Sequence, residues 1–239
     1  MQADFPDYSE PLGPNDIFHF DCHSGVGCFT DCCRELELAL TPYDVLRLKN
    51  VLGLSSREFL DRHAIIEFEQ ADRYPRVYLG MVDDGRASCP FVSKTGCLVY
   101  QDRPGACRTY PLARGASLQA KGDHALHVLL RETHCQGFSE LKQQRLKDWQ
   151  VDQELEVYNT HNDEMLAILN HPALTKGPGL TPEQAEIFIS SLYNLDIFRA
   201  KTKSENPAKT KGLDDAALLR YAIKWFIKTI LPVAENCER

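Results

Sequence analysis

Residues 20–33 of the chain have the sequence FDCHSGVGCFTDCC. Four cysteines fall within this loop, and the last two, Cys32 and Cys33, are adjacent. Four more follow in segments rich in turn residues, so that the candidate metal ligands are Cys22, Cys28, Cys32, Cys33, Cys89, Cys97, Cys107 and Cys135. We expect the fold to bring these eight thiols together around metal.

Composition narrows the class of protein. The chain has 239 residues, of which 43% are hydrophobic and 26% charged, which is ordinary for a soluble globular protein. Its net charge of -7 argues against nonspecific binding to nucleic acid or to anionic membranes. No apolar run approaches the roughly 18 residues of a spanning helix. We therefore expect neither nucleic acid nor membrane as a partner.

The compartment follows from the cysteines and the N-terminal segment. Residues 1–14 are acidic and proline-rich and have no apolar core, so they are not a secretory signal. We therefore expect a cytoplasmic protein whose thiols stay reduced. Nine cysteines in such a protein indicate metal binding or catalysis rather than a disulfide framework. The ninth, Cys237, is isolated in the C-terminal tail and is interpreted as a spare thiol.

The predicted fold class is α+β and mainly helical. We expect an N-terminal arm over residues 1–16 and a cysteine-cluster metal-binding domain over 17–140. A C-terminal helical region follows over 141–239. Within the metal-binding domain the sequence predicts a small sheet and an αα-hairpin.

Cap signals predict the αα-hairpin. Thr41 and Pro42 begin a helix that ends at Gly53, and Ser55 with Glu58 forms a capping box for a second helix. Strands are predicted over 76–82 and 125–131, whereas 63–71 is ambiguous between strand and helix. Farther along, the patterns predict helices over 141–169, from Thr181 to Phe198 and over 213–231, with a polar linker at 201–211.

Thiolate is a soft ligand that selects zinc, Cu(I) or the iron of iron–sulfur clusters. Eight cysteines could close two four-thiolate sites, or one cluster with bridging or spare ligands. The side chains of Cys32 and Cys33 diverge, so they are poorly placed to chelate one small ion together. They could serve two metals, two irons of one cluster, or one metal with the second sulfur buried. The spacings match neither a zinc-finger nor a ferredoxin signature.

The basic residues beside the cysteines give a second set of candidates. Four thiolates around Zn(II) or a [4Fe–4S] core leave a charge of about -2. Arg34, Arg103 and Arg108 are therefore candidate cofactor-binding residues that could offset this charge, and Arg114 lies nearby. Histidines near the cysteines are more often structural than ligating, and this applies to His23, His124, His127 and His134. No catalytic residue is indicated.

The order of these residues resembles the CxxCxxCC cysteine-cluster family (YkgJ-like), a zinc- or iron-chelating domain. The first block matches at Phe20, Cys22, Cys28 and Cys32-Cys33, and a Thr-Pro-x-Asp segment follows at 41–44. The second block comprises Cys89-Pro90-Phe91, Cys97 to Tyr100, Arg103-Pro104, Cys107-Arg108, Tyr110-Pro111 and Cys135-Gln136-Gly137. The match spans residues 17–138. The first loop is longer here than the two-residue spacings of the family.

The resemblance implies metal chelation. It also implies some similarity to the flagellin lysine-N-methylase group, whose members carry related cysteine clusters. Four functions stay open: an iron–sulfur cluster linked to redox chemistry or electron transfer, a structural zinc-binding interaction module, a metal-dependent modifying enzyme (methyltransferase-like), and a metal carrier. The expected cofactor is an iron–sulfur cluster or Zn(II). The expected partner is an unidentified protein or redox partner.

Overall fold

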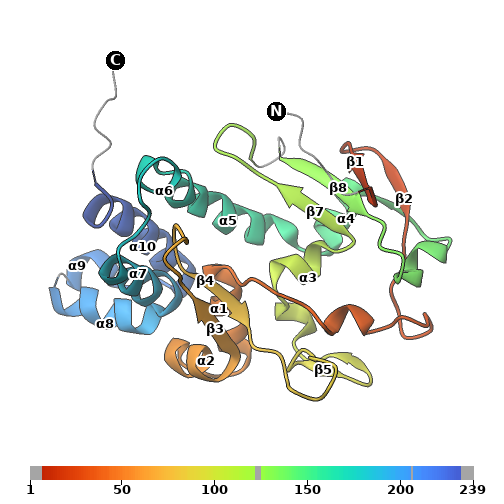
Figure 1. Cartoon of the computed structure of the whole chain (residues 1–239), viewed down its shortest axis with the longest axis horizontal. Coiled ribbons are helices and arrows are strands. Elements are labelled where there is room, and N and C mark those ends of the chain that lie inside the picture. Colours follow the sequence, from red (N-terminus) through yellow and green to blue (C-terminus); the bar gives the residue numbers. More distant parts are fainter. Residues whose placement is uncertain (1–6, 122–124, 206, 233–239) are drawn as a thin grey trace. The chain divides into compact units, whose positions relative to one another are not determined.

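The computed structural model describes residues 7–121, 125–205 and 207–232 and has an α+β fold, which confirms the predicted class (Figure 1). His124 and Cys237 lie outside these residues. The chain divides into two compact units, and each is made of two separate segments. We call residues 1–36 with 81–160 the cysteine unit, and residues 37–80 with 161–239 the helical unit.

This division differs from the domain limits expected from sequence. The segment 37–80 carries the αα-hairpin, and it belongs to the helical unit rather than to the unit that contains the cysteines. All eight candidate ligands lie in the cysteine unit, on both of its segments. None of the helices in the described part of the chain combines the length and hydropathy of a membrane span.

Three antiparallel sheets build the cysteine unit. In the largest, β8 (Leu126–Leu130) lies between β1 (Ser9–Leu12) and β7 (Leu112–Gly115). β2 (Ile17–His19) pairs with β9 (Gln143–Arg145), and β5 (Val92–Ser93) pairs with β6 (Gly96–Cys97). The expected arm therefore includes a strand, β1, because pairing with β8 satisfies its backbone.

An aromatic core anchors the sheets of the cysteine unit. Phe20, which opens the first cysteine loop, is 1% exposed and meets Trp149 edge-on at 5.6 Å between ring centroids. The Trp149 indole N–H donates to the carbonyl of Thr109, at the end of α3 (Gly105–Thr109), over 3.2 Å. The buried members of this core are Phe18, Phe20, Leu112, Leu129, Leu146, Trp149 and Leu155.

The prediction of a single helix over residues 141–169 is wrong. The chain forms β9, then α4 (Leu146–Asp152), and then α5 (Leu155–Leu169), which runs from the cysteine unit into the helical unit. The break lies at Gln153 and Glu154, and Glu154 has φ +50°. The Arg108 guanidinium donates to the backbone carbonyl of Gln153 over 2.8 Å, which removes that acceptor from the helical ladder.

The helical unit begins with the predicted αα-hairpin. α1 (Pro42–Val51) and α2 (Ser56–His63) both carry the expected capping boxes, from Thr41 with Asp44 and from Ser55 with Glu58. The ambiguous segment 63–71 contains β3 (Ala64–Glu67), which pairs antiparallel with β4 (Arg76–Leu79).

The C-terminal segment completes this unit. It comprises α6 (Pro172–Thr175), α7 (Pro182–Phe188), a π-helical turn (Ile189–Tyr193), α8 (Leu195–Glu205), α9 (Pro207–Thr210) and α10 (Asp215–Thr229). The predicted linker over 201–211 is therefore wrong: most of its described residues are helical. Thr202 and Thr210 are buried in these helices. Because both residues are polar, the sequence of this segment shows no apolar periodicity that would predict a helix.

Candidate metal centre

The first cysteine loop is held by short-range backbone hydrogen bonds rather than by regular structure. Val26 N–H donates to the backbone carbonyl of His23 over 3.0 Å, and Asp31 N–H donates to the backbone carbonyl of Cys28 over 2.9 Å. A single 3-10 turn, Asp31–Cys33, then carries the adjacent cysteines. Thr30, just before it, has φ +70°, a conformation that L-residues adopt rarely. The loop thus presents its thiols on tight turns.

The end of the cysteine unit meets the start of this loop. Gln136 N–H donates to the Cys28 sulfur over 3.2 Å, and Asp21 N–H donates to the Gly137 carbonyl over 3.1 Å. A β-carbon on Gly137 would lie 2.8 Å from both the Phe20 ring and the Asp21 carbonyl, so only glycine fits this approach. We call the sulfurs gathered here the first thiol group: Cys22, Cys28 and Cys135.

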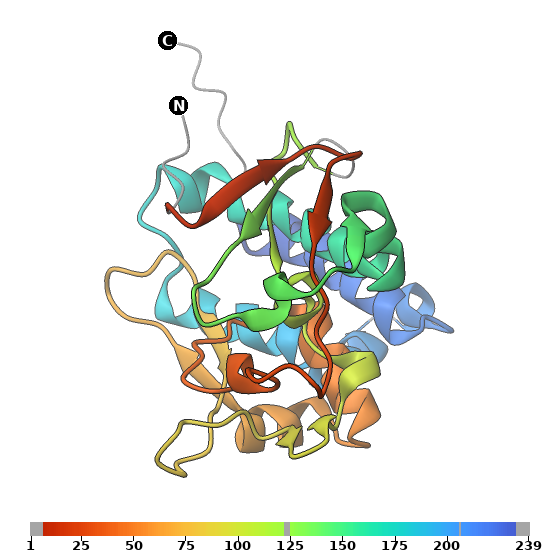
Figure 2. The same cartoon turned by 90° about the vertical axis from the view of Figure 1, so that its right-hand side faces the viewer.

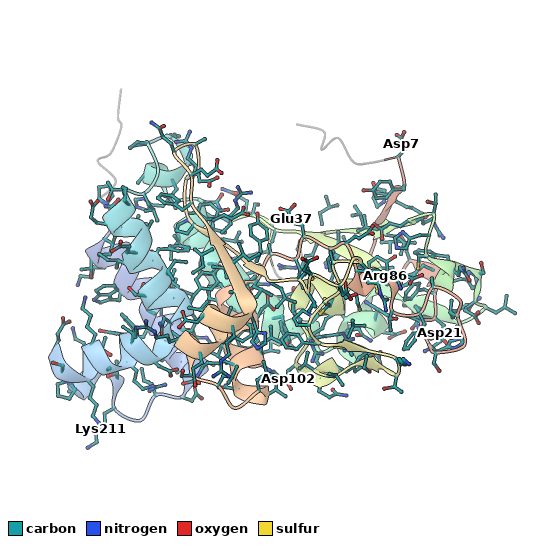
Figure 3. The ribbon with its side chains drawn as sticks, turned by 60° about the horizontal axis from the view of Figure 1, so that its bottom comes forward. Asp7, Asp21, Glu37, Arg86, Asp102 and Lys211 are labelled. Carbon is teal, nitrogen blue, oxygen red and sulfur yellow. The ribbon has the colours of Figure 1, made fainter. Side chains whose placement is uncertain are left out.

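A second set of cysteines lies around the β5–β6 hairpin. Cys89 N–H donates to the Cys33 carbonyl over 2.8 Å, and Cys97 is the cross-strand partner of Val92. Figure 2 shows the first cysteine loop beside this hairpin, and in Figure 3 Asp21, Arg86 and Asp102 mark the segments involved. We call these sulfurs the second thiol group: Cys33, Cys89, Cys97 and Cys107.

Backbone N–H groups point at several of these sulfurs. Hydrogen bonds from the N–H groups of Phe91 and Val92 oppose the burial that raises the pKa of Cys89. The N–H of Val99 acts in the same way on the pKa of Cys97. Such donors stabilise a thiolate and are typical of cysteine metal sites. All three donors lie within three residues after the cysteine that they contact.

The thiols also influence one another. Burial raises the pKa of Cys22 to about 11, and the neighbouring Cys32, Cys135 and Cys28 add to that shift. Burial likewise raises the pKa of Cys135, with Cys28 within hydrogen-bonding reach. Burial thus favours the neutral thiol at Cys22 and Cys135, and a bound cation would supply the positive charge that favours thiolate.

Cys32 and Cys33 behave differently because they share a hydrogen bond. The bond from Cys33 lowers the pKa of Cys32 to about 7, while the same contact and burial raise the pKa of Cys33. Cys32 is therefore the first of the pair to ionise. Its sulfur also acts on the pKa of Cys22, Cys89 and Cys97, so it lies between the two thiol groups.

The sulfurs are brought together without forming a closed ligand set. All eight cysteines from Cys22 to Cys135 are free thiols. In the part of the chain that the structure describes, no three His, Cys, Asp or Glu side chains are arranged to hold a metal ion as they stand. The donor chemistry fits zinc or iron, and closing a site would require the thiols to turn about their Cα–Cβ bonds. The ligand set therefore stays a prediction.

The three candidate arginines have different surroundings. Arg103 is buried and lies close enough to Cys97 and Cys107 for these thiols to affect its pKa, which burial lowers. It also stacks on Tyr100 at 3.7 Å from the ring centroid and donates to Gln153. Arg103 is thus placed to offset negative charge on the second thiol group.

Arg108 and Arg34 are engaged elsewhere. Arg108 is buried, donates to Gln153 and Gln101, and lies over the Tyr158 ring at 4.9 Å. Arg34 donates to the Thr30 carbonyl over 2.6 Å and thereby braces the turn that carries the adjacent cysteines. Both arginines thus have partners within the protein, and their role beside a metal stays a prediction.

Sequence reasoning did not single out Gln136 or Tyr110 as parts of the site. Gln136 acts through its backbone N–H, and only its position between Cys135 and Gly137 could have indicated this. Tyr110 lies edge-on to Phe20 at 6.1 Å between ring centroids and so packs against the aromatic core. Burial raises its pKa, and the nearby Cys135 and Glu132 raise it further.

The described histidines contact other groups. His23 Nδ1 accepts from Gly25 N–H over 3.1 Å, within its own loop, and its Nε2 lies 3.6 Å from Glu140. His127 is buried and shares a 3.0 Å hydrogen bond with Gln150. His134 Nε2 lies 3.8 Å from a carboxylate oxygen of Glu132. These contacts agree with the structural role expected for histidines at these positions.

Comparison with known proteins gives one finding. Neither the curated proteins nor the solved structures include a match to this chain. A family model matches residues 21–147, which is more than half of the chain. The matched residues include all eight cysteines from Cys22 to Cys135 but not Cys237. The family is CxxCxxCC, with the description "Putative zinc- or iron-chelating domain". The chain therefore belongs to the CxxCxxCC family, as the order of its cysteines predicts.

Proposed function

We propose that the clustered cysteine thiolates of this chain hold an iron–sulfur cluster that serves redox chemistry or electron transfer. The observation that carries the proposal is that eight free thiols, from both segments of the chain that form it, lie in one compact unit. Eight soft ligands exceed the four that one structural zinc requires. Membership of a zinc- or iron-chelating family supports metal binding in general.

The residues around the sulfurs suit such a centre. An iron–sulfur cluster, when bound, supplies one-electron transfer at a potential set by charge and by hydrogen bonds to sulfur. Here backbone N–H groups are directed at Cys28, Cys89 and Cys97. Each such bond stabilises a thiolate and thereby raises the potential of whatever the thiolate binds. The guanidinium of Arg103 adds a positive charge beside Cys97 and Cys107.

A protein is the partner that this function requires, since electrons must arrive and leave. The net charge of -7 supports a protein or small redox carrier over nucleic acid or an anionic membrane. The exposed side chains next to Cys97 are Leu98, 69% exposed, and Tyr100, 53% exposed. They are the groups that a partner approaching this cysteine would meet first.

Structural zinc is the second candidate, and a specific observation favours it. The description of the family names zinc as well as iron. The cysteine loops also contain little regular structure of their own, as expected where a closed metal site supplies folding energy. In this case the chain would be an interaction module without turnover.

Anaerobic purification of the full chain separates the two candidates. Iron and sulfide in stoichiometric amounts, with visible absorbance that bleaches on reduction, would support the iron–sulfur cluster. A colourless protein with stoichiometric zinc would overturn it in favour of the zinc module. The Cys237→Ser variant is the control, since the sequence predicts that this thiol is no ligand, and it should keep the metal content of the wild type.

A further inference from the structure

Backbone hydrogen bonds tie the cysteine segments together in two places rather than one. Around the first thiol group, Gln136 N–H bonds to the Cys28 sulfur over 3.2 Å and Asp21 N–H bonds to the Gly137 carbonyl over 3.1 Å. Both contacts bring the chain on either side of Cys135 against the chain beside Cys22 and Cys28. The absence of a β-carbon on Gly137 makes this approach possible.

Around the second thiol group the contacts are separate from these. Cys89 N–H bonds to the Cys33 carbonyl over 2.8 Å, and Leu98 N–H bonds to the Phe91 carbonyl over 2.8 Å. The second bond closes the turn that joins Cys89 to Cys97. Cys107 lies on α3 and is the next cysteine along the chain after Cys97, and the Arg108 guanidinium beside it donates to the carbonyl of Gln101, which ties α3 back to the chain that follows the β5–β6 hairpin.

The adjacent cysteines lie where the two groups meet. They occupy one 3-10 turn, in which neighbouring side chains point about 120° apart. The Cys33 backbone is bonded into the second group. Because the two side chains diverge from this turn, the Cys32 thiol points away from the side on which Cys33 joins the second group.

We propose that the chain holds two separate four-thiolate metal centres and that the peptide bond between Cys32 and Cys33 divides them. The first centre takes Cys22, Cys28, Cys32 and Cys135, and the second takes Cys33, Cys89, Cys97 and Cys107. This inference rests on the proposed thiolate metal binding, and it applies to iron–sulfur clusters and to zinc alike. It gives each residue of the adjacent pair its own metal.

Metal counting on the full chain tests the division. Iron, zinc and sulfide per chain are measured for anaerobically purified wild type, Cys28→Ser, Cys97→Ser and the double variant. Each single variant is expected to keep half of the wild-type metal, and the double variant none. Cys237→Ser, the matched control, keeps all of it. Loss of all metal in either single variant would mean one shared centre and would overturn the division.

The adjacent pair supplies the sharper test. Combined with Cys97→Ser, Cys32→Ser should abolish metal binding, whereas Cys33→Ser should reduce metal no further than Cys97→Ser alone. The reverse pattern would overturn the assignment of the pair. If a variant fails to fold, native mass spectrometry of wild type during graded addition of a chelator replaces it. A half-loaded species is expected, and release in a single step overturns the division.

These results keep the two claims apart. A wild type that holds no metal, even after reconstitution with iron and sulfide or with zinc, removes the proposed function and the division together. A wild type that holds metal but loses it all in one step removes only the division.

Discussion

The two compact units reach stability by different means. In the helical unit, fully buried side chains such as Phe59, Phe188 and Phe226 fill the interior, and helix ends are closed by their own capping boxes. In the cysteine unit, the aromatic core around Phe20 and Trp149 anchors the sheets, but the loops that carry the thiols rely on scattered turns.

The buried charges show the same difference. In the helical unit the buried Lys49 ammonium lies 3.3 Å from Asp215 and 3.5 Å from Asp196. In the cysteine unit, burial raises the pKa of thiols such as Cys22 and Cys89, and no closed set of ligands forms within the residues that the structure describes. The helical unit thus pairs its buried ammonium with carboxylates of its own, whereas the cysteine loops carry free thiols that the proposed metal would bind.

Loss of a proposed ligand should have the largest effect and should be confined to the cysteine unit. Cys107→Ser or Cys32→Ser is expected to lower metal content and stability together, since metal binding and folding are coupled and thiolate sites contribute roughly 10 kcal/mol. Hydrogen–deuterium exchange should show loss of protection over residues 81–110 in Cys107→Ser and over residues 20–33 in Cys32→Ser, with none over α10 in either variant. A variant that keeps full metal and the wild-type melting temperature removes that cysteine from the ligand set.

Phe226→Ala should produce the converse result. Phe226 is fully buried and lies edge-on to Phe188 at 5.5 Å, so truncation is expected to cost about 3–5 kcal/mol of unfolding free energy. Denaturant unfolding measures the loss, and metal content should stay at the wild-type value. Ile197→Ala, at a side chain that is 44% exposed, is the control and should change stability much less. Metal loss in Phe226→Ala would contradict the independence of the units.

Acid should weaken the helical unit through His161. This side chain is 2% exposed and stacks on Tyr43 at 4.2 Å between ring centroids. Burial, with a smaller contribution from Arg220 that Asp214 opposes, lowers the pKa of His161 from 6.5 to about 4. The unfolded chain therefore binds the extra proton more readily, and stability falls as the pH drops from about 6.5 toward 4, by about 3 kcal/mol in all.

Urea unfolding at pH 7 and pH 4.5 measures this effect, with Trp225 fluorescence as the probe in a Trp149→Phe background. His161→Phe is the control, because phenylalanine retains an aromatic ring against Tyr43 but cannot take up a proton. It should flatten the pH dependence of the helical unit. An unchanged slope in this variant would assign the acid sensitivity to other groups.

The smallest expected effect is the loss of one helix cap. Ser55 Oγ accepts from Glu58 N–H over 3.2 Å at the start of α2, so Ser55→Ala is expected to cost about 1 kcal/mol. Thermal unfolding of the helical unit measures it. Ser55→Asp, which keeps an acceptor at this position, is the control and should retain most of the stability. Metal content should be the same in both variants.

Sequence predicted those parts of the fold that depend on local signals. The caps at Thr41, Ser55 and Thr181 begin helices as expected, since each side chain bonds to a backbone three residues away. The strands β4 and β8 follow from their apolar patterns. The break at Gln153 could not be predicted, because the group that takes its carbonyl, Arg108, is 45 residues distant.

The same limit applies to the site. The cysteines and their order identify the family and the chemistry, because thiolate preference depends only on residue type. How the thiols fall into groups depends on contacts such as Gln136 N–H to Cys28, which join distant segments and have no side-chain signature. The three arginines looked alike in sequence, and only the contacts of Arg103 relate it to thiols.

The chain passes between the two units at residues 36–37, 80–81 and 160–161. During synthesis on the ribosome, the first cysteine loop emerges long before Cys135, and the segment 37–80 of the helical unit is made before the β5–β6 hairpin. The eight thiols are therefore all present only after Cys135 has been translated. Any fragment truncated at a single point will cut through one unit, so attempts to express the metal-binding part alone should join residues 36 and 81 with a short linker instead.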